Sequence, residues 1–394
     1  MREMKDSGLK WIGQIPNGWE VNRIKYLFKT AKGLSVTKDN LIEEGLPVIS
    51  YGQIHSKINT GVIVADELRR FVSYDYRKYV SSKLEKFDFA FADTSEDYEG
   101  CGNCVYKRTD DELYGGYHVV ILHSIKKEDN RYFAYLFQTD AWREQIRTKA
   151  SGVKVFSVTQ KIINEASVII PPVEMQARIS NFLDAKCAEI DALTADIQTQ
   201  IDTLEQYKRS VITESVTKGL NPDVEMKDSE NLIIGKIPKH WNMAKVKNVA
   251  TRITVGVVVT PASYFDDKGT VAFLRGINVK EYVINSEPMV YITEETNEEL
   301  SKTIVHTNDL VIVRDGAIGV TAVVPKEYDG SNVVSMIIVS TIDEYNSDFL
   351  CYVLNSYVGK IQFDLTRIGS ALSHTSVFSV SNIEIPKPCI DEQN

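Results

Sequence analysis

Apolar side chains recur in steps of three and four residues along one uninterrupted stretch in the middle of the chain. This spacing predicts an amphipathic helix of the coiled-coil type, and neither proline nor glycine occurs between Pro172 and Gly219 to interrupt it. Pro171 and Pro172 mark the start of the helix, and Gly219 with Pro222 mark its end. We therefore expect one long helix over residues 172–220.

A helix of this length needs a partner along its apolar side. About 45 residues rising 1.5 Å each make a rod of roughly 65 to 70 Å, which is longer than a typical domain is wide. Packing inside its own domain is the alternative, but the length favours a seam with another helix. The expected seam residues are Ile179, Leu183, Ile190, Leu193, Ile197, Ile201, Leu204 and Val211. Acidic residues outnumber basic ones along the helix, which indicates contact with protein rather than with phosphate.

The sequence on either side of the helix has a different pattern. Short β-rich runs at 87–91, 118–122, 310–313 and 333–339 are separated by turn-forming residues, and helical patterns also occur on both sides. The helical patterns cover residues 130–149 and 347–365. A mixed α/β domain is therefore expected on each side of the helix.

The two flanking regions are copies of one another. MKDSGLKWIGQIPNGW (4–19) and MKDSENLIIGKIPKHW (226–241) align without gaps at an offset of 222, and 151–176 aligns with 368–393 at an offset of 217. Between these ends, Tyr51 and Gly52 are paired with Arg275 and Gly276, and Asp88 is paired with Asp309. A repeat of this length indicates domain duplication, with boundaries at 1–171, 172–220 and 221–394.

Composition narrows the class of protein. The 394 residues are 43% hydrophobic and 25% charged, as in globular proteins, and no apolar run is long enough for a membrane span or a signal peptide, so a cytoplasmic location is expected. The net charge of -9 means that any contact with DNA is local or shared with a partner. Cys101 and Cys104 supply half of a zinc site at most, so no metal is expected.

No catalytic constellation is found in the sequence. GxxxxGK[ST], HExxH and GxSxG are all absent, and the six histidines lack the spacing of metal ligands. His118 and His123 lie in an apolar run, which predicts structural histidines. The sequence therefore favours recognition over catalysis.

The order of the segments resembles the specificity subunit of a type I restriction-modification system. The motifs that carry the resemblance are IGQIPNGW and IGKIPKHW, IIPPVEMQARISNFLDAK and TKGLNPDVEMKDS, and it extends over the whole chain. It implies two tandem target recognition domains, each reading one half of a split DNA sequence, with helices that fix the gap between the halves. It also implies that those helices dock two methyltransferase subunits.

The resemblance places the chemistry on partner subunits. A methyltransferase subunit is implied to bind S-adenosylmethionine and to methylate adenine N6, and a restriction and translocase subunit is implied to consume ATP with Mg²⁺. This chain is expected to hold no cofactor and to be non-catalytic, because chemistry on a base needs an enzyme pocket that receives it.

The candidate DNA contacts are polar side chains at expected strand ends or turns beside the repeated motifs. In the first copy they are Tyr51, Gln53, Lys57 and Lys154, and in the second they are Arg275, Asn278, Lys280, Arg314 and His374. The alternative for each one is a solvated surface residue. The DNA sequence recognised and the spacer length are not encoded in a form that can be read from these residues.

A complete family member carries a second long helix after the second recognition domain, whereas this sequence stops at PKPCIDEQN. We expect another polypeptide to supply that helix: a second copy, a separate fragment or the methyltransferase subunits. The alternatives are a truncated or regulatory specificity subunit and a duplicated scaffold that binds protein without DNA specificity. The number of methyltransferase subunits bound, and whether the complex cleaves or only methylates, stay open.

Overall fold

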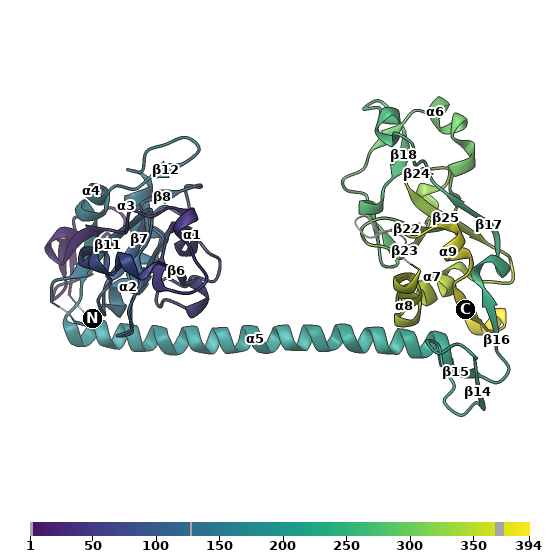
Figure 1. Cartoon of the computed structure of the whole chain (residues 1–394), viewed down its shortest axis with the longest axis horizontal. Helices are drawn as coiled ribbons and strands as arrows, with labels where there is room; N and C mark the ends of the chain where they lie inside the picture. The colour runs from purple at the N-terminus through teal and green to yellow at the C-terminus, as the bar shows by residue number, and fades with distance from the viewer. Residues whose placement is uncertain (1–2, 127, 367–373) are drawn as a thin grey trace. The chain divides into compact units, whose positions relative to one another are not determined.

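The structure is a computed structural model that describes residues 3–126, 128–366 and 374–394 (Figure 1). The chain divides into two compact units, Met1–Ala195 and Asp196–Asn394. The long helix α5 (Val173–Lys218) gives its first half to the first unit and its second half to the second. The central helix is therefore confirmed, within two residues of its predicted ends. No helix in the described part of the chain is long and apolar enough to cross a membrane.

A four-stranded antiparallel sheet forms the centre of the first unit. Its order is β4 (Phe28–Lys32), β11 (Val119–Ser124), β7 (Phe89–Ala92) and β9 (Cys104–Tyr106). Because side chains alternate across a strand, the two faces of this sheet enter two different apolar cores.

Helices cover one face of this sheet. Phe89 and Phe91 of β7 pack edge-on against Phe137 at the end of α2 (Arg131–Phe137), and α3 (Asp140–Arg147) follows directly. The other elements of the first unit are the parallel and antiparallel sheet β10 (Tyr114–Gly115), β5 (Leu46–Ile49) and β6 (Arg70–Val72); the pairs β1 (Met4–Asp6) with β2 (Gln14–Pro16), β8 (Thr94–Ser95) with β12 (Phe156–Ser157), and β3 (Glu20–Arg23) with β13 (Ser167–Ile170); and the helices α1 (Tyr51–Ile54) and α4 (Gln160–Glu165).

The second unit repeats this plan. Its four-stranded sheet has the order β17 (Ala250–Val255), β25 (Met336–Thr341), β22 (Leu310–Val313) and β23 (Thr321–Val323), position for position the order of the first. The other elements are the sheet β21 (Tyr291–Ile292), β18 (Val271–Leu274) and β24 (Asn332–Val333); the pairs β14 (Met226–Asp228) with β15 (Lys236–Pro238), β16 (Asn242–Lys245) with β26 (Glu384–Lys387), and β19 (Val279–Lys280) with β20 (Val283–Ile284); and the helices α6 (Glu294–Glu299), α7 (Ser347–Asn355), α8 (Tyr357–Leu365), α9 (Val377–Ser381) and α10 (Ile390–Gln393).

The mixed α/β fold in two repeated units is thus as the sequence predicted, but one pairing between the copies was wrong by a residue. β5 pairs in parallel with β10, and β18 with β24, in a register that places Val48 over Phe273. Arg275 is therefore the counterpart of Ser50 and not of Tyr51. The incorrect pairing arose because a glycine follows both Tyr51 and Arg275 in the sequence.

The predicted β-rich runs also needed correction at their ends. His118 has φ of 55° and Ser335 has φ of 48°, and β11 and β25 begin only at the next residue in each case. A left-handed residue cannot continue an extended strand, so the run 333–339 is broken into β24 and β25. A hydrophobicity pattern carries no signal for such a break.

Candidate nucleic-acid interface

In the first unit, main-chain contacts fix the ends of two neighbouring strands and one following segment relative to one another. We call this arrangement the frame; it consists of Asp93 after β7, His118 before β11 and Val158 after β12. Val119 is paired with Ala92, so Asp93 and His118 lie opposite one another where β7 ends and β11 begins, and the Asp93 N–H donates to the His118 carbonyl at 3.1 Å. The Val158 N–H donates to the Asp93 carbonyl at 2.8 Å, which fixes the segment after β12 beside this end. Because main-chain groups make these contacts, the frame does not depend on which side chains it carries.

The second unit contains the same frame. The pairing of Met336 with Val313 places Arg314 opposite Ser335. The Thr375 N–H donates to the Arg314 carbonyl at 3.1 Å, as Val158 does to Asp93 in the first unit. A bridge between Asp315 and His374 corresponds to the pairing of Thr94 with Ser157 in β8 and β12.

Polar side chains of the first unit gather on this frame. His118 is exposed, and its Nδ1 lies 3.0 Å from Asp93 Oδ1 and 3.3 Å from Thr94 Oγ1. The ring of Tyr51 meets the His118 ring edge-on at 5.5 Å. The His55 Nε2 lies 2.8 Å from the Thr94 carbonyl, so α1 is joined to the frame as well. Hydrogen-bonding groups and aromatic rings are thus presented together at one surface.

The second unit presents different side chains on its frame. Ser335 Oγ donates to Asp315 Oδ2 at 3.0 Å. A hollow of about 550 Å³ adjoins this pair and is lined by Asp315, Arg275 and Lys280 among others. Arg275 is half-buried, with Nη2 donating to the Pro288 carbonyl at 2.9 Å. One region of this unit therefore contains four of the predicted contacts, Arg275, Lys280, Arg314 and His374. It also contains the hydrogen-bonded pair of Asp315 and Ser335, which the sequence did not single out.

Two of the predicted contacts hold the turns of the frame. The Gln53 side-chain oxygen accepts from the Ser50 N–H at 3.2 Å, and the Asn278 side-chain oxygen accepts from the Arg275 N–H at 3.0 Å. Asn278 is fully buried and also donates to the Pro288 carbonyl at 3.1 Å. Both positions are the third residue of a helical turn, so an amide at that spacing was a capping signal.

The two remaining predicted contacts are lysines on exposed segments of the first unit. Lys154 lies in the short exposed loop closed by the bridge between Ser151 and Ser157, directly before the frame. Lys57 is exposed just after α1. Both are placed where a phosphate could reach them, and they stay predictions.

The predictions for the two histidines of the apolar run have opposite outcomes. His123 is structural, because its Nδ1 lies 2.6 Å from the buried carboxyl of Asp88. The structural prediction for His118 was wrong, because that side chain is exposed by 57%. Asp93, Asp315 and Ser335 did not stand out in the sequence, because they are brought together only by the register of the paired strands.

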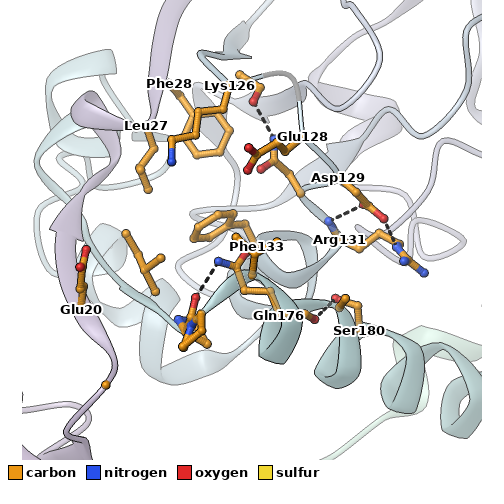
Figure 2. Close-up of a pocket in the computed structure, with 18 residues that line it drawn as sticks. Glu20, Leu27, Phe28, Lys126, Glu128, Asp129, Arg131, Phe133, Gln176 and Ser180 are labelled. Atoms are coloured by element: carbon orange, nitrogen blue, oxygen red, sulfur yellow. Dashed lines mark hydrogen bonds and ion pairs between the residues drawn. The ribbon is translucent and has the colours of Figure 1, made fainter.

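A second hollow, of about 440 Å³, lies in the first unit where α5 begins (Figure 2). Apolar side chains such as Leu27, Phe28 and Phe133 line it together with charged ones of both signs. The charged lining residues are Lys126, Arg131, Glu20, Glu128 and Asp129, so no single sign of charge collects there. Gln176 Nε2 donates to the Pro171 carbonyl at 2.8 Å and fixes the first turn of α5. Within residues 3–126, 128–366 and 374–394, no group of three His, Cys, Asp or Glu residues is placed to hold a metal ion.

The predicted seam of α5 divides into covered and exposed parts. In the first unit Ile179 packs against the apolar core, and Leu183 is half-buried, whereas Ile190 and Leu193 are exposed. In the second unit the exposed members are Ile197, Ile201, Leu204 and Val211, each at 42% or more. The alternative of a helix packed on its own domain therefore applies to its two ends, and the middle carries an uncovered apolar stripe.

Comparisons with known proteins point to one family. Residues 16–203 match the family described as Type I restriction modification DNA specificity domain. A Methanocaldococcus jannaschii protein assigned as the specificity subunit of the type I restriction enzyme MjaX is 24% identical over 97% of this chain and 86% of its own length. The specificity subunit of the Escherichia coli type I restriction enzyme EcoBI is 21% identical over 68% of this chain and 57% of its own length.

Two solved structures share the fold. A chain from a study of complex assembly and conformational transition of the type I R-M system aligns with a TM-score of 0.69 at 15% identity, over 96% of this chain and 88% of that one. The HsdS subunit of Thermoanaerobacter tengcongensis aligns with a TM-score of 0.50, also at 15% identity, over 96% of this chain and 87% of that subunit.

Proposed function

Because the chain belongs to the specificity subunits of type I restriction-modification systems, we propose that it reads a bipartite DNA sequence for a methyltransferase complex. One unit reads each half of the target. The proposal rests above all on the main-chain frame that the two units share, with Asp93 and His118 in one and Arg314 and Ser335 in the other. A common frame that carries different side chains is what two readers of unrelated half-sites require.

The proposed chemistry lies outside this chain. The methyltransferase subunit would bind S-adenosylmethionine, take an adenine out of the duplex and methylate it. A restriction subunit joined through the methyltransferase would consume ATP with Mg²⁺. The contribution of this chain is to hold those subunits at the correct place on double-stranded DNA.

The exposed stripe of α5 is the proposed docking surface for a partner helix. Ile190, Leu193, Ile197, Ile201 and Leu204 follow one another along the helix with solvent-exposed apolar side chains. Contact with an apolar partner would remove that surface from water at a gain of about 25 cal/mol per Å². The methyltransferase subunits, a second copy of this chain and a separate helical fragment are the proposed sources.

Methylome sequencing tests the proposal directly. Cells that express the chain with its methyltransferase should carry N6-methyladenine within one bipartite motif, and the same cells without the chain should lose that methylation. Duplex DNA with the motif should bind the purified complex in a salt-dependent way, and a scrambled duplex should bind far more weakly.

A duplicated scaffold that binds only protein is the competing function. It predicts that the complex assembles on α5 but shows no preference between the two duplexes. That outcome, together with an unchanged methylome, would exclude DNA recognition by this chain.

A further inference from the structure

The two units place four side chains at equivalent positions of the shared frame. Strand register and main-chain bonds pair Asp93 with Arg314 and His118 with Ser335. The matched bridges then pair Thr94 with Asp315 and Ser157 with His374. No pair keeps the same residue, although the four positions are equivalent in strand register and in the contact with the following segment. Divergence at fixed positions is expected where the two copies have different ligands.

The backbone at one of the four positions is strained in both units. His118 and Ser335 have φ of 55° and 48°, a region that non-glycine residues seldom adopt. Each one directly precedes the strand, β11 or β25, that pairs with the strand ending at Asp93 or Arg314. Such a conformation is unfavourable for a residue other than glycine, and it is commonly kept where it aims a side chain for function. Two copies that have diverged elsewhere both retain it.

Hydrogen bonds pre-organise these side chains without burying them. Thr94 Oγ1 donates to Asp93 Oδ1 at 2.8 Å, and the His118 ring meets the same oxygen. Ser335 is held by Asp315 in the same manner. The groups are therefore ordered at the surface with hydrogen-bonding capacity left over, which favours contact with base edges over contact with mobile phosphates.

The location also suits contact with DNA. In Figure 1 the pair β8 and β12, which carries Thr94 and Ser157, lies on the side of the first unit away from α5. A surface remote from the helix stays open when partners cover the helix.

Resting on the proposed function, we infer that these two sets of four residues determine which bases each half of the target contains. The first set is Asp93, Thr94, His118 and Ser157, and the second is Arg314, Asp315, Ser335 and His374. In the second set Arg314 donates to the O6 and N7 of a guanine. In the first set Asp93 stands at the same position as a hydrogen-bond acceptor, which pairs with the exocyclic amino group of cytosine or adenine. The two halves of the motif therefore differ at the position that these two residues read.

The test uses the intact complex of the chain with its methyltransferase, in which single variants are compared by methylome sequencing. Asp93→Asn and His118→Ala should relax the sequence of the first half only, and Arg314→Gln and Ser335→Ala the second half only. Affinity for a duplex with the wild-type motif should fall about tenfold or more for Arg314→Gln. The Arg314→Gln complex should then bind duplexes substituted at one base of the second half about as well as it binds the duplex with the wild-type motif.

Matched controls lie at the opposite ends of the same strands. Lys86, whose side chain is 39% exposed, precedes β7, and His306, at 64%, precedes β22, whereas Asp93 and Arg314 follow these two strands. Lys86→Gln and His306→Ala should leave both halves of the motif unchanged. Thermal denaturation of every variant separates a loss of recognition from a loss of folding.

Three results would overturn the inference. One is an unchanged motif with all four variants while the wild-type complex methylates specifically. Another is uniform weakening of Arg314→Gln on every duplex with a salt slope smaller by about one, because that is the behaviour of a phosphate contact. A third is relaxation of both halves by a variant of one unit. Absence of any motif with the wild-type complex would instead refute the proposed function itself.

Discussion

Tyr135 donates its hydroxyl hydrogen bond to the carboxylate of Asp184 on α5 at 2.7 Å. Arg131 Nη1 donates to the other oxygen of that carboxylate at 2.6 Å. Two side chains of α2 therefore bind one acidic side chain in the first half of α5. Burial would raise the pKa of Asp184, but the hydrogen bonds from Tyr135 and Arg131 outweigh it and lower that pKa below its usual value. The anchoring of the helix on this unit is therefore sensitive to acid.

The first prediction concerns this anchor. A carboxyl whose pKa is lowered in the folded state stabilises it above the unfolded pKa of about 4, and that stability is lost as the pH falls through the folded pKa. Asp184→Asn should lower the free energy of unfolding at pH 7 by about 1–3 kcal/mol, and the difference from wild type should shrink below about pH 4. Urea unfolding at pH 7 and pH 3 measures both. Asp191→Asn, at an exposed position of the same helix, is the control, and a difference independent of pH would contradict the prediction.

A second prediction concerns His123, whose pKa is shifted in the opposite direction to that of Asp184. The hydrogen bond to Asp88 raises the pKa of His123 despite its partial burial. A raised folded pKa stabilises the protein below the unfolded value of about 6.5, and this stability disappears as the pH rises through the folded pKa. His123→Gln should therefore cost about 1–2 kcal/mol more at pH 6 than at pH 9. Thermal denaturation at the two pH values tests this, with the exposed His306→Gln as control; equal losses at both pH values would count against it.

The parts of the fold that follow a sequence period were predictable. The apolar spacing from Ile179 to Val211 defined α5 because one helix keeps one period over many turns. The main-chain frame that carries the proposed base contacts was not predictable in the same way. Asp315 and Ser335 meet only because β22 and β25 pair in a particular register, and a residue list contains no information on that register. Arg314 and His374 were singled out as strand-end residues, but the residues that hold the frame beside them were not.

A third prediction concerns the core of the first unit. Trp142 is fully buried, its ring centroid lies 4.4 Å from that of Phe137 with the planes tilted by 41°, and its Nε1–H donates to the Ser167 carbonyl at 3.1 Å. Trp142→Ala should destabilise the chain by about 3–5 kcal/mol because it leaves a large cavity. Trp142→Phe should cost less, because it keeps part of the ring packing and loses the hydrogen bond. Urea unfolding of the two variants orders them, and a larger loss for phenylalanine than for alanine would show that packing is not the main term.

The fourth prediction separates the exposed stripe of α5 from its packed end. Ile201 is 45% exposed in the second unit, whereas Val216 is 4% exposed and belongs to the core there. Ile201→Asp should change the free energy of unfolding by no more than about 0.5 kcal/mol, since surface substitutions seldom do more, yet weaken binding of the methyltransferase subunit about tenfold or more. Val216→Asp should instead unfold the second unit, because it buries an unpaired charge. Thermal denaturation reports the first effect, and co-purification with titration calorimetry reports the second. Wild-type affinity in Ile201→Asp would mean that the partner does not use this stripe, whatever the stability of the variant.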